Sequence, residues 1–217
     1  MPKSFKRFTR PGKPRAAGAR GRISNETRSA ETRQKLLDAA ISSIQERGYH
    51  GTTLTAVSKR AGLTRGALQH HFGQRKVNLM TETAEQAYRQ LQTRYVSSIE
   101  QCKSRSPADA ARGLFNDLAE LFETPESMAL IEIWMASRGD QELAKAVLST
   151  IHGIDREVTK SWNQLFSGLP RGDLYRGIGR SLSSGLPLEL LIHRDPALLR
   201  RVAIFVGELV ARDIEDA

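Results

Sequence analysis

Apolar residues recur at helical spacing along most of the chain, and this pattern limits the possible folds more than any other feature. From Glu31 onward they stand three or four residues apart, and no segment alternates convincingly between apolar and polar residues as a half-buried strand does. Gly48 supplies a natural end for the first helix, and Gly62 permits a sharp bend after a much shorter second one. The sequence therefore predicts an all-α protein with about nine helices.

Capping residues divide this pattern into separate helices. Ser106-Pro107 and Thr124-Pro125 each combine an N-cap with a proline at the first turn. The segment after Pro125 is apolar on nearly every side, including Met135, and this is typical of a buried core helix. The predicted helices are Arg33 to Gly48, Leu54 to Ala61, a short one after Thr64, about Arg75 to Cys102, one after Ser106, one after Thr124, Gln141 to Phe166, about Arg171 to His193, and Pro196 to Ile214.

Positive charge is concentrated at the N-terminal end. Residues 1–28 contain nine Lys or Arg and one Glu, and residues 29–80 contain eight Lys or Arg and three acidic residues. Of the net charge of +9, the first 80 residues therefore carry +13 and the rest −4. A basic end on a mildly acidic body indicates a polyanionic partner, with nucleic acid as the leading candidate and an anionic membrane surface as the alternative.

Three segments follow from this distribution. Residues 1–28 are rich in Pro and Gly and poor in large apolar side chains, so we expect a disordered basic arm that either contacts DNA or only improves solubility. Residues 29–80 are expected to bind DNA, and residues 81–217 to form a helical domain for regulation and dimerisation.

Several function classes find no support in the sequence. No run of about eighteen apolar residues and no secretory signal peptide is present, so we expect a cytoplasmic protein without a membrane partner. Cys102 stands alone, and no two histidines have the spacing that metal ligands favour on a helix, so we expect neither metal nor cofactor. The sequence shows no pairing of a nucleophile with a base, so we do not expect an enzyme. A helical enzyme with a basic tail, and a membrane-binding or scaffold protein, are the weaker alternatives.

Between Thr53 and Phe72, two short helices joined by a glycine-containing turn form a helix-turn-helix, whose second helix enters the major groove of DNA. Leu68 and Phe72 stand four residues apart and turn toward the core. Arg65 and Gln69 share the opposite face and suit guanine and adenine, so we expect them to read bases. The side chains left facing outward are Arg65, Gly66, Ala67, Gln69 and His70.

Further residues around these helices suit phosphate contacts. Thr53, Thr55 and Thr64 lie at helix starts, where unpaired backbone N–H groups attract anions. The alternative is that they only cap helices. Near the end of the second short helix, we expect three more residues to bind the flanking DNA backbone electrostatically: His71, Arg75 and Lys76. The alternative is that they are solvated charges and a packed ring.

Residues 32–80 closely resemble the N-terminal domain of the tetracycline-repressor (TetR) family. The family signature A-G-x-[ST]-x-x-x-L-x-x-H-F stands here as AGLTRGALQHHF, from Ala61 to Phe72. Gln69 replaces the family's usual tyrosine, and Arg75 its usual lysine. The resemblance implies DNA contacts from Thr53, Thr64, Arg65, Ala67, Gln69, His71 and Arg75.

The resemblance also implies a transcriptional regulator, usually a repressor, that binds double-stranded DNA at a palindromic operator as a homodimer. A small-molecule effector would move the helix from Arg75 to Cys102 and release the operator. The apolar faces of the last two helices can form the dimer interface or complete the monomer core. The predicted pocket residues, which can also be ordinary core, are Phe115, Phe122, Met128, Trp134, Met135, His152, Trp162 and Phe166.

Overall fold

The structure is a computed structural model that describes the backbone of residues 18–166 and 168–217, and their side chains except those of 18–24, 149–155 and 157. The described residues form α-helices and turns without any strand, so the predicted all-α fold is confirmed. The helices are α1 (Gly18–Gly51), α2 (Leu54–Arg60), α3 (Arg65–Phe72), α4 (Lys76–Cys102), α5 (Pro107–Leu121), α6 (Pro125–Ser137), α7 (Gln141–Phe166), α8 (Gly172–His193) and α9 (Pro196–Glu215).

The bounds of α2 to α9 agree closely with the prediction, whereas α1 is longer than expected. It begins at Gly18, so the expected disorder does not hold for residues 18–28. A helix that is already nucleated by packed residues extends at little cost through solvent-exposed positions. No proline interrupts residues 18–51. The remainder of the predicted basic arm, residues 1–17, lies outside the described residues.

Helices α1 to α4 share a core with the rest of the protein. Leu36 and Ile44 of α1 are fully buried together with Leu68 of α3 and Leu79 of α4. The same cluster continues into α6 and α7, for example at Ile133. One apolar core therefore spans the helix-turn-helix and the body, and α3 belongs to the same packed cluster as α4 and α6.

The end of α1 is tied to α6 at a kink. Gly48 has a φ of +69°, in the left-handed region that glycine adopts without strain. The next backbone N–H, of Tyr49, donates a hydrogen bond to Glu132 Oε2 at 3.0 Å. This side chain of α6 therefore holds the C-terminal turn of α1.

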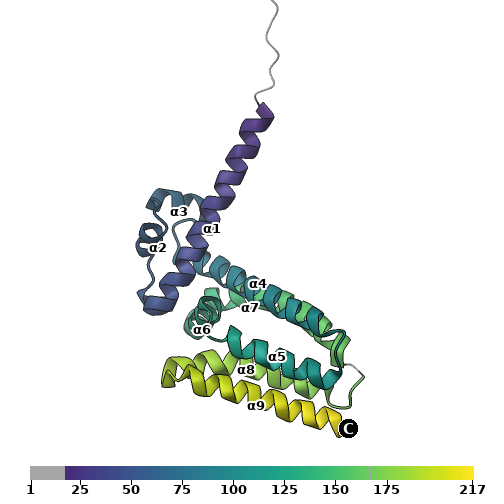
Figure 1. Ribbon diagram of the computed structural model, residues 1–217. Coiled ribbons are helices and arrows are strands. Elements are labelled where there is room, and N and C mark those ends of the chain that lie inside the picture. Colours follow the sequence, from purple (N-terminus) through teal and green to yellow (C-terminus); the bar gives the residue numbers. More distant parts are fainter. Residues whose placement is uncertain (1–17, 167) are drawn as a thin grey trace, which may run out of the picture.

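The body is layered, with α4 and α7 above and α5, α8 and α9 below in the view of Figure 1. A second core lies between these layers and includes Phe115, Trp162 and Tyr175. α5 and α9 pack so closely that a Cβ atom added at Gly207 would stand 2.7 Å from Phe115 Cβ. Figure 1 also shows α1 projecting away from the body beside α2 and α3.

α6 is less completely buried than its composition suggests. Met128, Ile131 and Ile133 are buried, but Met135 is 53% exposed. α6 packs against α1, α4, α7 and α8, and Met135 lies on the side of α6 that these helices leave exposed. None of the described helices has the length and hydropathy needed to cross a membrane.

Candidate nucleic-acid interface and ligand cavity

The bend between α2 and α3 is fixed by local hydrogen bonds. Thr53 Oγ1 accepts a hydrogen bond from the backbone N–H of Ala56 at 3.1 Å and so caps α2. Thr64 Oγ1 accepts one from Ala67 N–H at 3.1 Å and caps α3. Gly62 between them has a φ of +66°. Both threonines are thus helix caps in the free protein, and both remain exposed at the helix starts.

α3 is anchored by one face and open on the other. Leu68 and Phe72 are buried, and the guanidinium of Arg33 lies over the Phe72 ring, 5.7 Å from its centroid. On the other face, Arg65, Gly66 and His70 are exposed, whereas Ala67, Gln69 and His71 are half-buried. The side that the sequence predicts to meet DNA is therefore accessible along the helix.

Arg65 is held in place by α2. Its Nη1 donates a hydrogen bond to Thr55 Oγ1 at 2.7 Å, which joins two residues that the sequence predicts to contact DNA. An arginine steadied in this way loses less side-chain entropy when it binds a base or a phosphate.

Arg75 is occupied by the body of the protein. As the N-cap residue of α4, it forms two hydrogen bonds to Glu142 in the first turn of α7, one of them at 2.6 Å. The hydrogen bond to Glu142 is the main cause that raises the pKa of Arg75. The two side chains are 64% and 52% exposed, so this is a solvent-screened ion pair that a DNA phosphate can displace.

Lys76 is turned inward, which differs from the predicted phosphate contact. Its Nζ donates a hydrogen bond to the carbonyl of Tyr49 and lies 4.1 Å from the centre of the Tyr49 ring. Burial lowers the pKa of this ammonium group. The physical reason for the difference is that the end of α1 offers the ammonium group two partners, the Tyr49 carbonyl, which also accepts from Thr52 N–H, and the face of the Tyr49 ring.

His71 also differs from the prediction of an electrostatic contact. Burial lowers the pKa of its imidazole, and the charges of His70 and Arg33 lower the pKa further. The ring is therefore predominantly neutral at pH 7. It can offer a hydrogen bond to the DNA backbone but not a full positive charge.

A cavity of about 480 Å³ lies in the body among α4, α5, α6, α7 and α8. Its size falls within the range of about 300–1,000 Å³ that is typical of small-molecule sites. The lining is mainly apolar and aromatic. Its described members include Tyr88, Leu91, Tyr95, Leu118, Phe122, Ile131, Trp134, Val147, Trp162, Arg176 and Arg180.

Three predicted pocket residues, Phe122, Trp134 and Trp162, line this cavity. Four others do not: Phe115, Met128 and Phe166 are buried elsewhere in the core, and Met135 faces outward. The side chain of His152 lies outside the described residues. Helical spacing identifies residues that share a face, but it does not tell whether that face meets a packed neighbour or a gap, and this is why the list is only partly correct.

The sequence prediction missed the walls formed by α4 and α8. All of its pocket residues lie between Phe115 and Phe166, whereas Tyr88 and Tyr95 come from α4, and Arg176 and Arg180 from α8. One signal was available, because Arg176 and Arg180 stand one helical turn apart among small and apolar residues. The two tyrosines carry no such signal.

Two polar atoms of the cavity wall have unusual surroundings. Trp134 Nε1 and Arg176 Nε are buried, and neither has a hydrogen-bond partner among the described residues. Trp162 Nε1 differs, since it donates to the carbonyl of Gly172 at 3.2 Å. The first two donors are therefore free to bind a ligand, whereas Trp162 serves the fold.

Apolar side chains gather on the outside of α8 and α9. Of the ten large apolar side chains that are exposed among the described residues, eight lie on these two helices, and Phe205 is the most exposed at 63%. Other residues of the predicted dimer faces complete the monomer core, including Leu186, Leu199 and Ala203. Each helix thus has a buried side that belongs to the monomer core and an exposed apolar side, and the dimer interface stays a prediction for the exposed side.

Comparisons with known proteins agree with this geometry. A family model described as "Bacterial regulatory proteins, tetR family" matches residues 36–83, which span the C-terminal part of α1, all of α2 and α3, and the start of α4. The HTH-type transcriptional regulator CymR of Pseudomonas putida is 28% identical over 179 residues, which cover 81% of this chain and 87% of that protein.

Solved structures share the fold of most of the chain. A TetR-family transcriptional regulator from Rhodococcus sp., described as putative, aligns with a TM-score of 0.66 at 18% identity and covers 84% of this chain and 99% of its own. The multidrug binding protein EbrR, complexed with imidazole, aligns with a TM-score of 0.54 at 21% identity, over 79% of this chain and 92% of its own. At this level of identity, the likeness concerns the fold alone.

Proposed function

We propose that this chain, a DNA-binding transcriptional regulator that belongs to the tetR family of bacterial regulatory proteins, represses the genes it controls. It binds a palindromic operator as a homodimer. A small-molecule effector releases it from this operator. The observation that carries this proposal is the free outer side of α3, led by Arg65, opposite the buried Leu68 and Phe72. A helix held by one face can insert the other into the major groove. Such a regulator works where the DNA is, which in a bacterium is the cytoplasm.

The connection between the cavity and α3 supports control by an effector. α4 follows α3 directly and contributes Tyr88 and Tyr95 to the cavity wall. α6 contributes Trp134 to the wall and Glu132 to the end of α1. A ligand that shifts α4 or α6 would therefore change the position of α3.

Dimerisation supplies the geometric requirement for such control. Two recognition helices bind adjacent major grooves only if they are about 34 Å apart. Pairing through the exposed apolar side of α8 and α9 would place one α3 on each side of a two-fold axis. A change in their separation would then weaken operator binding. The small molecule seen with EbrR gives a precedent in the same fold for ligand binding.

Selection of bound DNA from a random pool, with the full chain, tests the proposal. We expect recovery of a palindrome whose half-sites are centred about one helical turn apart. The Arg65→Ala variant should relax the preference at one position in each half-site, with a loss of about 1–3 kcal/mol of discrimination there. Unselected DNA of random sequence, or a sequence without two-fold symmetry, would contradict the proposal. A uniform loss on all sequences would show that Arg65 contacts only phosphate.

A further inference from the structure

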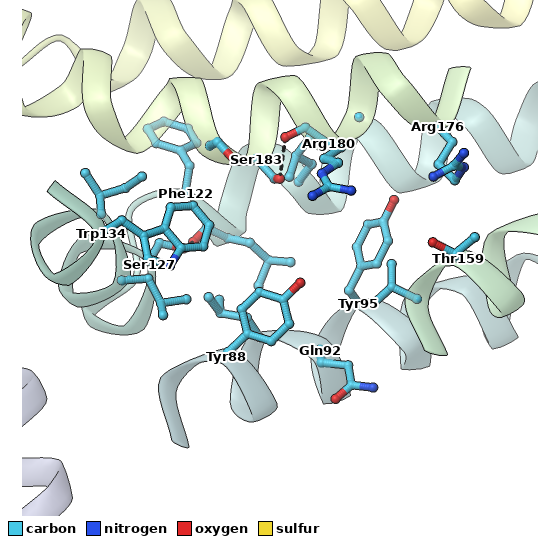
Figure 2. A pocket seen from close by; sticks show the side chains of 18 of the residues that line it. Tyr88, Gln92, Tyr95, Phe122, Ser127, Trp134, Thr159, Arg176, Arg180 and Ser183 are labelled. Atoms are coloured by element: carbon cyan, nitrogen blue, oxygen red, sulfur yellow. Dashed lines mark hydrogen bonds between the residues drawn. The ribbon is translucent and has the colours of Figure 1, made fainter. Parts of the chain in front are cut away.

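The polar groups of the cavity are unevenly placed. Figure 2 shows Trp134 and Phe122 at one end, and Arg176 with Thr159 at the other. Arg180 lies between them on α8, and the Tyr95 hydroxyl points toward the part of α8 that carries the two arginines. Apolar side chains such as Leu91 and Ile131 form much of the remaining wall.

Arg176 has no counter-charge among the side chains that the structure describes. The residue is half-buried, its Nε atom is buried, and its side chain forms neither a hydrogen bond nor an ion pair with any described residue. A buried donor without a partner costs free energy, because it has lost its hydrogen bonds to water. An anion that enters the cavity would supply the missing acceptor.

Acidic groups are missing from the described part of the lining, which contains two arginines but no aspartate or glutamate. Asp117 lies outside the lining, although its charge, after burial, contributes to the raised pKa of Tyr95. The Tyr95 hydroxyl consequently keeps its proton at neutral pH. The unpaired groups, Trp134 Nε1 and Arg176 Nε, are both donors, so the wall favours a ligand that brings acceptors and negative charge.

We propose that the effector is an amphipathic organic acid, bound as its anion, with the carboxylate on Arg176 and the apolar body between α4 and α6. The role of this acid as an effector rests on the proposed function, whereas the specificity of the cavity for an acid does not depend on it. The planar fork of an arginine matches a carboxylate in a way that a neutral or cationic group cannot reproduce. The apolar walls contributed by Leu118, Ile131 and Trp162 suit an alkyl or aryl body.

Tryptophan fluorescence offers a direct assay. The chain has two tryptophans, Trp134 and Trp162, and both line the cavity, so emission reports on its occupancy. The probes are decanoate, 4-phenylbutanoate and 2-naphthoate, each compared with the primary amide of the same carbon skeleton. We expect at least one acid to bind, and to bind at least about tenfold more tightly than its amide, because the amide lacks the negative charge and the second acceptor oxygen of the carboxylate.

The Arg176→Gln variant should abolish this preference while keeping the affinity for the amide. Arg138→Gln provides a matched control, since Arg138 is exposed and does not line the cavity. Arg176→Lys keeps the charge and should restore part of the preference. Binding of the amide by Arg176→Gln shows that the cavity is intact.

Three results would overturn the proposal: equal binding of acid and amide by the unaltered chain, a preference that survives in Arg176→Gln, or no binding of any acid. The first and third need no variant, so they decide the matter even if Arg176→Gln does not fold. Operator release is measured separately, by anisotropy of labelled operator. Acids that bind without releasing the operator would contradict effector control but uphold the acid specificity. Operator release by neutral compounds alone would uphold effector control but contradict the acid specificity.

Discussion

At the scale of single residues, neighbouring side chains decide what each predicted DNA contact can contribute. Arg65 is exposed and steadied by Thr55, so it is ready to meet a base or a phosphate. Lys76 serves the end of α1 instead. His71 lies between these cases, because it is half-buried and its pKa is lowered.

The lowered pKa of His71 predicts a specific dependence of stability on pH. Well above pH 6.5, its ordinary value, the ring is neutral in both the folded and the unfolded chain and adds no pH dependence. As the pH falls below 6.5, the unfolded chain takes up the proton first, so the free energy of unfolding decreases. His71→Gln should therefore lose less stability than the unaltered chain between pH 7.5 and pH 5.5, as measured by urea denaturation.

His50→Gln serves as the control, since His50 is exposed on the kinked end of α1. It should lose as much stability as the unaltered chain over the same range. If His71→Gln and His50→Gln behaved alike, the argument from burial at His71 would be wrong.

At the scale of helices, the close approach of α5 and α9 depends on one missing side chain. A Cβ atom at Gly207 would lie 2.7 Å from Phe115 Cβ, an atom that cannot move without its backbone. Gly207→Ala should therefore destabilise the fold by about 1–3 kcal/mol through overpacking. Chemical denaturation measures this loss directly.

Gly177 on α8 provides the matched comparison. It lies inside a helix, is exposed, and has no atom within 4 Å of an added Cβ. Gly177→Ala should stabilise the protein by up to about 1 kcal/mol, because alanine has the higher helix propensity. If Gly207→Ala also stabilised the protein, helix propensity and not packing would govern Gly207.

At the scale of the whole molecule, the ion pair between Arg75 and Glu142 connects the DNA-binding helices with α7. Glu142 competes with DNA phosphates for Arg75, so removing its charge should favour the operator complex. We expect Glu142→Gln to bind the operator about two- to fivefold more tightly at low salt, in keeping with the modest strength of exposed pairs. The gain should vanish at about 0.5 M salt, where screening is strong.

Arg75→Gln tests the other partner of this pair. It should weaken operator binding and reduce the slope of log affinity against log salt by about one. If Arg75→Gln bound the operator more tightly, or if Glu142→Gln bound it with unchanged affinity, Arg75 would not be a DNA contact.

Dimerisation is a second property at this scale. Phe205 is 63% exposed, and an aspartate there would place a charge at the centre of the apolar side of α9. Phe205→Asp should yield a folded monomer in light scattering, with unchanged helicity and much weaker operator binding. Met135→Asp is the control, since Met135 is 53% exposed on α6. If the Phe205→Asp variant stayed dimeric, the dimer interface would not include this side of α9.

The sequence by itself determined the helices and the outward face of α3. Caps such as Thr64 and Ser106 form the predicted hydrogen bonds, because capping depends on residues three apart. The positions of Leu68 and Phe72 likewise follow from helical spacing. These are local effects, so a single chain segment contains the information they need.

The tertiary structure alone decided which aromatic residues line a cavity, which cations are free, and which apolar faces remain exposed. Phe115 packs against α9 while Phe122 borders the cavity, although the sequence predicts both for the pocket. Arg75 meets Glu142 from a helix far along the chain, and Arg176 meets no described acid. Each outcome depends on the distance between helices that are remote in sequence, and local spacing carries no record of that distance.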